Sequence, residues 1–291
     1  MRRTERELNV VLIAPGGMLG RAWTQLLQAR GIEHRALGRP ALDLSDLESL
    51  EQAFDGKPTH VINCGAYTDV DGAEEHEAAA TRINGEAVGV LADHSHHADA
   101  TLVHYSTDYV FSGRSQTPYT TTAARAPINA YGRSKAAGER AIEASKCRHL
   151  LMRTSWVYAS WGQNFVLTMA RLSAQRDQLS VVDDQRGRPT SAVYLAQRSL
   201  DLILAGAEGM YHVTDGGECT KFELTCELVR MLNRRCDVRP CTSDAFPTPA
   251  KRPAYSVLDL TATEDLIGVS TAWQSNLADV LARLPATSND A

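Results

Sequence analysis

Short β-rich runs alternate with helical stretches through the first half of this chain, and this alternation constrains the fold more than any other feature. Strands separated by helices are typical of βαβ units, which build parallel sheets. We therefore expect an α/β fold with a doubly wound parallel sheet. The expected strands are residues 9–14, 34–37, 60–64, 101–106 and 149–153, and the expected helices are residues 19–29, 46–54, 82–94 and 130–145.

The pattern changes after Thr154, where helices and strands no longer alternate regularly. We expect residues 1–154 to form one domain and residues 155–291 mainly a second, smaller mixed α/β domain, with residues 192–214 returning to the large sheet. Prolines at 240, 247, 249 and 253 predict a loop over residues 233–255, and residues 285–291 are expected to fray. The elements expected in this half are helices 164–176, 192–204 and 222–232, strands 179–182 and 210–214, and a turn at 183–189.

Composition excludes several classes of protein. The 291 residues are 43% hydrophobic with a net charge of −5 and no basic run, which argues against nucleic acid as a partner. The longest apolar runs are strand-sized, so no membrane span is expected, and the charged start does not resemble a signal peptide. We therefore expect a cytoplasmic protein. Six scattered cysteines form no Cys-x-x-Cys pair, and the histidines of residues 94–97 indicate a polar helix end, so no metal site is expected.

A glycine-rich turn joins the first expected strand to the first helix. Glycines allow a tight turn and close backbone approach, and the following helix N-terminus presents free N–H groups to a phosphate, as in Rossmann-type folds. We expect Gly16, Gly17, Met18, Leu19 and Gly20 to bind the pyrophosphate of a dinucleotide. In a Gly-x-x-Gly-x-x-Gly spacing, residue 14 takes the first place, and the alanine found there fits only if its φ stays negative. Gly16 offers alternative flexibility.

The second strand ends at Gly38-Arg39-Pro40. An arginine here accommodates the 2′-phosphate of NADPH, whereas an acidic residue accepts hydrogen bonds from the ribose of NADH. Arg39 therefore favours NADPH, and Asp43 leaves NADH open; a solvated loop arginine is the alternative interpretation. Leu44 is expected beside the adenine, and Gly65, Ala66 and Tyr67 beside the ribose and phosphates.

Tyr131 and Lys135 are spaced by four residues in a segment with high helix propensity, so both side chains face the same side. A neighbouring ammonium favours the phenolate and brings a phenol closer to acid/base work at neutral pH. The hydroxyl of Thr107 would complete the hydrogen-bond network of a catalytic site for a nicotinamide-dependent reductase. The same spacing also occurs on surface helices whose tyrosine and lysine are merely solvated, so the assignment depends on the surrounding sequence.

Taken together, these segments resemble the extended short-chain dehydrogenase/reductases, and within them the dTDP-4-dehydrorhamnose reductases. The resemblance covers almost the whole chain. It implies Tyr131 as proton donor, Lys135 holding the nicotinamide ribose, and Thr107 steadying the carbonyl. The segments that carry it are residues 17–20, 67–71, 106–111, 131–135, 153–158, 164–165, 184–185, 187, 189–190 and 252–253.

The resemblance also implies a dTDP-sugar nucleotide as substrate, contacted by Thr107, Asp108 and Trp156. A planar indole suits a sugar or thymine ring, although a buried core tryptophan is the alternative. Arg186 and Arg188 could meet the diphosphate or be solvated loop residues. The implied protein is a monomer or homodimer, and magnesium dependence stays open, since no carboxylate cluster suggests a site.

The implied reaction is NAD(P)H-dependent reduction of the C4 carbonyl of dTDP-4-dehydro-β-L-rhamnose to dTDP-β-L-rhamnose. A 4,6-dehydratase would carry an acidic residue after Asp108, where this chain has Tyr109. Two alternatives remain: another sugar-nucleotide 4-keto reductase, and a non-catalytic dinucleotide-binding subunit like the regulatory subunit of methionine adenosyltransferase.

Overall fold

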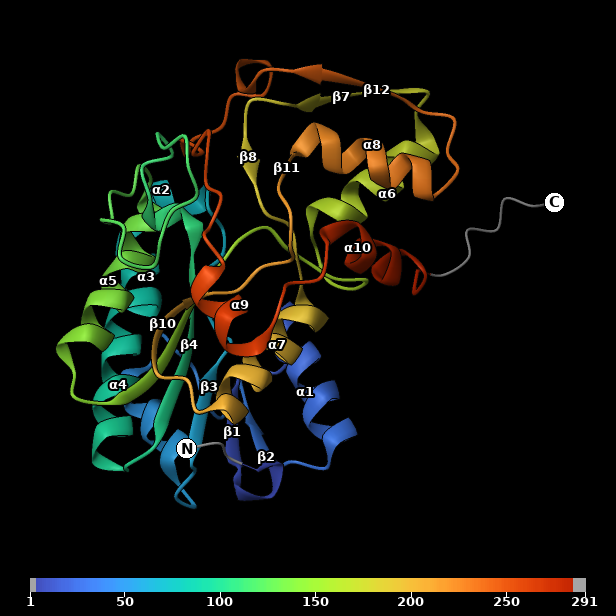
Figure 1. The fold of residues 1–291 in the computed structure, drawn as a ribbon. Helices are drawn as coiled ribbons and strands as arrows, with labels where there is room; N and C mark the ends of the chain where they lie inside the picture. The colour runs from blue at the N-terminus through green and yellow to red at the C-terminus, as the bar shows by residue number, and fades with distance from the viewer. Residues whose placement is uncertain (1–3, 285–291) are drawn as a thin grey trace.

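The central element of the fold is a six-stranded parallel sheet in the order β10-β5-β4-β3-β1-β2. It is seen in a computed structural model that describes residues 4–284. The predicted doubly wound α/β fold is confirmed, with its smaller mixed unit above the sheet (Figure 1). The strands of the large sheet are β1 (Asn9–Ile13), β2 (Glu33–Leu37), β3 (His60–Asn63), β4 (Thr101–Thr107), β5 (Arg148–Thr154) and β10 (Gly209–His212).

Helices cover both faces of this sheet because successive strand residues point to opposite sides. Val10 and Leu12 of β1 pack in one cluster with Trp23 of α1. Val11 and Ile13 pack in another. The first face carries α1 (Met18–Arg30) and α7 (Ala192–Ala205), and the second carries α4 (Ala87–His97), α5 (Ala130–Ala144) and the 3-10 helix η2 (Leu47–Phe54).

The helix expected at residues 82–94 is longer and interrupted. It runs as α3 (Glu77–Thr81), a π-helical turn η3 (Arg82–Glu86) and then α4. A Cβ at Gly138 of α5 would lie 2.2 Å from the carbonyl oxygen of Asn84, so α5 packs against this turn at backbone distance. Short helices complete this part: η1 (Glu5–Glu7), α2 (Gly72–Glu75) and η4 (Asp108–Val110).

The smaller unit stands at the carboxyl end of the large sheet (Figure 1). Its core joins Tyr158, Leu224, Leu228 and Leu277. Its elements are β6 (Val157–Tyr158), α6 (Phe165–Gln175), β7 (Gln178–Val182), β8 (Arg186–Gly187), β9 (Thr190–Ser191), β11 (Cys219–Thr220), α8 (Lys221–Met231), β12 (Asp237–Cys241), η5 (Ser243–Ala245) and α10 (Trp273–Leu281). They form three two-stranded sheets, β6 with β9, β7 with β12, and β8 with β11.

The prediction of a continuous loop over residues 233–255 was wrong. This segment contains β12, which pairs in parallel with β7, and Pro240 lies opposite Val181. An edge strand tolerates proline, since only one of its sides donates hydrogen bonds to a partner. The turn expected at 183–189 likewise contains β8, which pairs with β11.

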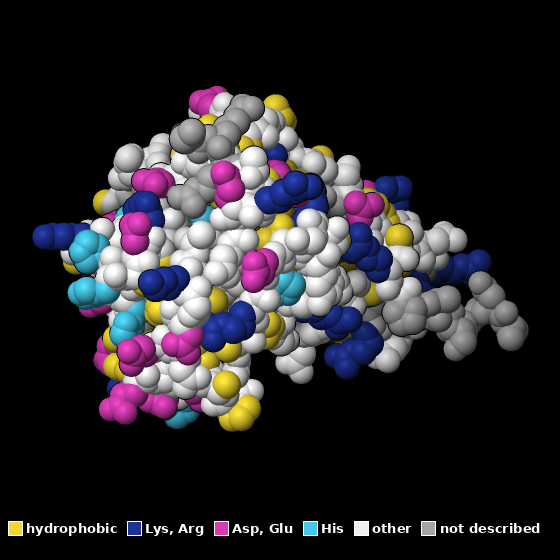
Figure 2. Space-filling model, turned by 90° about the horizontal axis from the view of Figure 1, so that it is seen from below, with side chains coloured by type: hydrophobic (Ala, Val, Ile, Leu, Met, Phe, Trp, Pro, Cys, Tyr) yellow, Lys and Arg dark blue, Asp and Glu magenta, His cyan; other side chains and the backbone are white. Residues whose placement is uncertain are grey.

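The chain returns to the large sheet after the smaller unit begins. Strand β10 pairs with β5, α7 packs beside α1, and α9 (Thr261–Ile267) packs against α7 and β10. The expectations for the first three residues and for residues 285–291 lie outside the described part of the chain. Within residues 4–284, no helix is both long and apolar enough to span a membrane. Figure 2 shows acidic and basic side chains scattered over the face seen from below.

Candidate active site

The turn after β1 brings helix α1 unusually close to the strand end. A Cβ at Gly20 would lie 2.1 Å from the carbonyl oxygen of Ala14, so only glycine fits. Helix α1 begins at Met18, and its first N–H groups lie at the carboxyl edge of the sheet, where Leu19 also lies. The smaller unit supports this turn, since the indole N–H of Trp161 donates to the Met18 carbonyl at 3.1 Å.

Ala14 departs from what the sequence led us to expect. Its φ is +60°, in the left-handed region that costs an L-residue about 1–2 kcal/mol. Among the described residues, Gly16 is not one of the positive-φ positions, so it does not take over this role. The tight geometry of the turn therefore stores strain at the alanine.

Arg39 and Asp43 lie together beyond the end of β2. Arg39 Nε is 2.8 Å from Asp43 Oδ2, and the arginine side chain is 71% exposed. Hydrogen bonds from the backbone and side chain of Ser45 lower the pKa of Asp43, and Arg39 adds to this. The two residues that favour different cofactors thus form one exposed ion pair.

The loop after β3 is held by two buried asparagines. The Gly65 N–H donates to Asn63 Oδ1 at 3.0 Å. Asn84 accepts from the Tyr67 N–H and donates to its carbonyl. A Cβ at Gly65 would lie 2.5 Å from Cδ1 of Leu44, so the expected adenine and ribose segments touch here, with Ala66 between Gly65 and Tyr67.

The expected catalytic hydroxyls meet at the end of β4. Thr107 donates to Asp108 Oδ1 at 2.9 Å, and its side chain adjoins the Tyr131 phenol closely enough to lower the pKa of that group. Tyr109 contacts Tyr131 edge to face, with 5.9 Å between ring centroids. Burial raises the pKa of Asp108 to about 6, although the hydrogen bond from Thr107 opposes the rise. The carboxyl of Asp108 is only 2% exposed.

The expected effect of Lys135 on Tyr131 is not seen. Burial, and then the charge of Asp108, raise the pKa of Tyr131 to about 12. The Lys135 Nζ instead donates to the Tyr105 carbonyl at 2.6 Å and lies 3.2 Å from Nε2 of His104. Burial lowers the pKa of this lysine to about 8. In this geometry Tyr131 is held as a neutral phenol, which suits a proton donor.

His104 links the lysine to the loop after β3. Its Nδ1 lies 3.2 Å from Nδ2 of Asn63, whose Oδ1 holds Gly65. Burial, and then the charge of Lys135, lowers the pKa of His104 well below its ordinary value. A histidine between Val103 and Tyr105, two residues of the hydrophobic core, is the local sequence signal for this contact. Sequence reasoning missed His104, and it missed Asn63 and Asn84 as well.

A buried ion-pair network lies beside the end of β4. Glu139 of α5 accepts hydrogen bonds from Ser106 at 2.5 Å and from Arg153 at 2.8 and 2.7 Å. Arg125 joins it at 2.9 Å. Because Ser106 precedes Thr107 directly, this network anchors the end of β4 to α5, the helix that carries Tyr131.

Trp156 follows β5 with φ +47° and contacts a residue that the sequence did not indicate. Lys221 Nζ lies 3.4 Å from the centroid of its ring. A Cβ at Gly187 would lie 2.8 Å from the same indole, which explains the glycine there. Arg186 lies near Glu218 and Glu223.

Arg188 contacts a different part of the smaller unit from Trp156. It donates to the Gly217 carbonyl and lines a separate hollow of about 450 Å³. The expected diphosphate role of Arg186 and Arg188 therefore has no support in their contacts.

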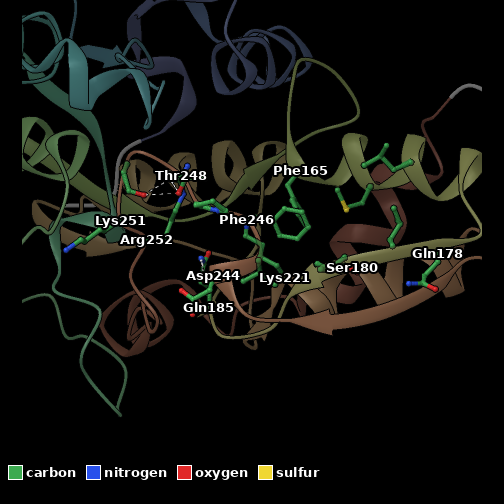
Figure 3. Close-up of a pocket in the computed structure, with 18 of the residues that line it drawn as sticks. Phe165, Gln178, Ser180, Gln185, Lys221, Asp244, Phe246, Thr248, Lys251 and Arg252 are labelled. Carbon is green, nitrogen blue, oxygen red and sulfur yellow. Dashed lines mark hydrogen bonds between the residues drawn. The ribbon is translucent and has the colours of Figure 1, made fainter.

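A pocket of about 950 Å³ lies in the smaller unit, between α6, β7 and the segment from 243 to 252 (Figure 3). Arg252 at its edge makes two bonds of 2.7 Å to Asp71, which lies 181 residues earlier in the chain. Thr107, Tyr131 and Trp156 do not line this pocket, but Lys221 does, and it also contacts Trp156. Lys221 therefore connects the pocket with Trp156.

The residues present fit a dinucleotide. The phosphate turn, the Arg39 and Asp43 pair and the loop at 65–67 follow β1, β2 and β3, and Thr107 ends β4. All of them lie at the carboxyl edge of the sheet. The order reverses between β1 and β3, and dinucleotides bind at such a point. The missing room for a Cβ at Gly20 and Gly65 shows that α1 and the loop after β3 pack closely against the turn that follows β1.

Comparisons with known proteins agree with this geometry. The family described as the RmlD substrate binding domain matches residues 8–285. A dTDP-4-dehydrorhamnose reductase of Streptomyces griseus is 43% identical over 251 residues, 84% of this chain and 83% of that protein. A dTDP-4-keto-6-deoxy-D-glucose reductase of Streptomyces niveus is 41% identical over 83% of this chain and 85% of that protein. The solved dTDP-4-dehydrorhamnose reductase from Bacillus anthracis in complex with NADP has a TM-score of 0.90 at 32% identity, covering 94% of this chain and 99% of that one.

Proposed function

The chain belongs to the family of the RmlD substrate binding domain and, within it, to the dTDP-4-dehydrorhamnose reductases, and from this premise we propose that it reduces the C4 carbonyl of dTDP-4-dehydro-β-L-rhamnose to dTDP-β-L-rhamnose. The observation that carries the proposal is the meeting of Thr107 and Tyr131 beside Asp108, at the end of the sheet where a dinucleotide fits. The relative from Bacillus anthracis binds NADP, and Arg39 suits the same cofactor here.

Tyr131 is the proton donor in this proposal. Its pKa, raised to about 12 by burial and by Asp108, keeps the phenol protonated at neutral pH. Thr107 adjoins that phenol, and both hydroxyls would meet the same carbonyl oxygen. When bound, a reduced nicotinamide supplies the hydride, and the protein supplies position and charge.

Lys135 has a different place in the proposal. Its Nζ is held by the Tyr105 carbonyl and His104, one helical turn beyond Tyr131. Protonated below its lowered pKa of about 8, this ammonium would hold the nicotinamide ribose and replace the proton lost by the phenol. Gly16, Gly17 and Gly20 would hold the pyrophosphate.

Substitution of Tyr131 by Phe tests the assignment. Loss of the donor is expected to lower turnover by about 10²–10⁴-fold, while NADPH affinity stays nearly unchanged. The assay follows NADPH absorbance with and without the keto sugar nucleotide. Tyr109→Phe is the matched control, because Tyr109 packs against Tyr131 but its backbone N–H, rather than its phenol, bonds Thr107. Undiminished turnover in Tyr131→Phe would refute the role.

A second candidate is reduction of a different dTDP-4-keto sugar. The relative from Streptomyces niveus, named for dTDP-4-keto-6-deoxy-D-glucose, is nearly as similar as the one from Streptomyces griseus. Assays with each keto sugar nucleotide separate the two candidates, because the two substrates differ in configuration at C3 and C5 and NMR identifies the product of each. Turnover of dTDP-4-keto-6-deoxy-D-glucose in preference to the rhamnose precursor would favour this second candidate.

A further inference from the structure

The ammonium of Lys221 is held between two aromatic rings. Lys221 begins α8, directly after the Thr220 N-cap, and its Nζ lies 3.4 Å from the ring centroid of Trp156 and 4.8 Å from that of Phe165. Aromatic faces attract a cation through their quadrupole but do not replace a hydrogen-bond acceptor. The rings therefore position the ammonium without satisfying its three donors.

Protein groups do not supply the missing acceptor. Within residues 4–284, Lys221 Nζ has no hydrogen-bond partner and no carboxylate at ion-pair distance. A lysine with a half-buried side chain and no anionic partner carries a desolvation cost. A bound anion would remove that cost.

Lys221 also occupies the junction between pocket and catalytic groups. It lines the pocket of about 950 Å³, and in Figure 3 it lies beside Phe165 in the middle of that pocket. The ammonium also contacts Trp156, and the negative charge of Asp108, the residue after Thr107, favours the charged form of this lysine. Arg252, another cation of the pocket wall, already makes two bonds to Asp71. Lys221 is thus placed where an elongated ligand would pass from pocket to catalytic site.

We propose that Lys221 binds the diphosphate of the sugar nucleotide, with the nucleoside in the pocket and the sugar towards Thr107 and Tyr131. This inference rests on the proposed function. A diphosphate is the one charged part of such a ligand, and it lies between the nucleoside and the sugar, as Lys221 lies between the pocket and Trp156. Its oxygens would accept charge-assisted hydrogen bonds from the ammonium.

Proton linkage gives this contact a measurable signature. Burial lowers the pKa of Lys221 to about 7, while Cys219 and Asp108 oppose the fall and Arg252 adds to it. A bound diphosphate favours the charged lysine, so binding takes up a proton and affinity falls as the pH rises above about 7. The other charged groups that line the pocket are Arg176, Asp244 and Lys251.

The experiment compares two ligands of the full-length protein by calorimetry and ligand-observed NMR. One is dTDP-glucose, whose diphosphate keeps its charge near neutral pH, and the other is uncharged thymidine. Lys221→Met is expected to weaken dTDP-glucose binding about 10- to 100-fold and to leave thymidine binding unchanged. Lys221→Arg should retain most of the affinity and lose its fall above neutral pH, since arginine does not titrate there.

Lys251→Met is the matched control, because Lys251 lines the same pocket with an exposed side chain. It should lower dTDP-glucose affinity much less than Lys221→Met. Unchanged dTDP-glucose affinity in Lys221→Met, or an equal loss for thymidine, would overturn the inference. Wild-type protein that binds dTDP-glucose through Lys221 but reduces no keto sugar would refute the proposed function and leave the diphosphate contact standing.

Discussion

Gly20→Ala tests whether the close approach of α1 to β1 builds the nucleotide site. The added Cβ would lie 2.1 Å from the Ala14 carbonyl oxygen, 2.8 Å from Cα of Pro15 and 2.9 Å from the Ala14 carbonyl carbon. All three are backbone atoms, so no side-chain rotation relieves the clash. Helix α1 would have to move away by roughly 1 Å to restore normal contact.

Two effects of this substitution have opposite signs. Alanine in a helix interior is favoured over glycine by about 1 kcal/mol, and Gly20 lies in the first turn of α1, so propensity alone predicts a protein more stable by at most about that amount. Overpacking costs about 1–3 kcal/mol, and the rigid neighbours place this site at the upper end. We therefore expect a net loss of about 1–2 kcal/mol, or a fall in melting temperature of about 2–4 °C. NADPH affinity should fall about tenfold or more, because the displaced helix moves its N–H groups away from the pyrophosphate.

Thermal unfolding and a fluorescence titration with NADPH measure both effects. Gly16→Ala is the matched control for stability, because its Cβ would meet no atom within 4 Å. That variant should change the free energy of unfolding by about 0.5 kcal/mol at most. A Gly20→Ala protein as stable as wild type and with undiminished NADPH affinity would refute the reasoning.

Two further predictions concern stability. Glu139→Gln should lower the free energy of unfolding by about 3–5 kcal/mol near pH 7, because it leaves Arg153 buried without a countercharge. Burial alone would raise the pKa of Glu139, but hydrogen bonds from Arg153, Ser106 and Arg125 outweigh burial and lower the pKa below its ordinary 4.5. The stability difference between wild type and Glu139→Gln, measured by urea denaturation, should therefore shrink only as the pH falls below that value. A stability difference that vanishes near pH 7 would contradict the assignment. Ala14→Gly should raise the melting temperature slightly. Relief of about 1–2 kcal/mol of backbone strain in the folded state exceeds the cost of about 0.5–1 kcal/mol from the greater chain entropy of glycine in the unfolded state. A less stable variant would argue against strain at residue 14.

Interactions over long sequence separations account for what sequence reasoning missed. The bonds between Asp71 and Arg252 join residues 181 positions apart, and nothing local to either residue indicates its partner. The contact of Lys221 with Trp156 depends on how the smaller unit packs above the sheet. Strand β12 was not predicted, because proline indicates a loop when the strand that pairs with the segment is unknown.

Local pattern determined much of this protein by itself. The alternation of strands and helices determined the parallel sheet. The segments at 14–20, 107–111 and 131–135 predicted a nucleotide site and a catalytic site, since strand ends and helix starts depend on neighbouring residues. Only the tertiary structure decided the positive φ of Ala14, the attachment of Lys135 to His104 and the raised pKa of Tyr131. Backbone strain, burial and electrostatic environment arise from atoms that the fold brings together, so the spacing of residues along the chain does not contain them.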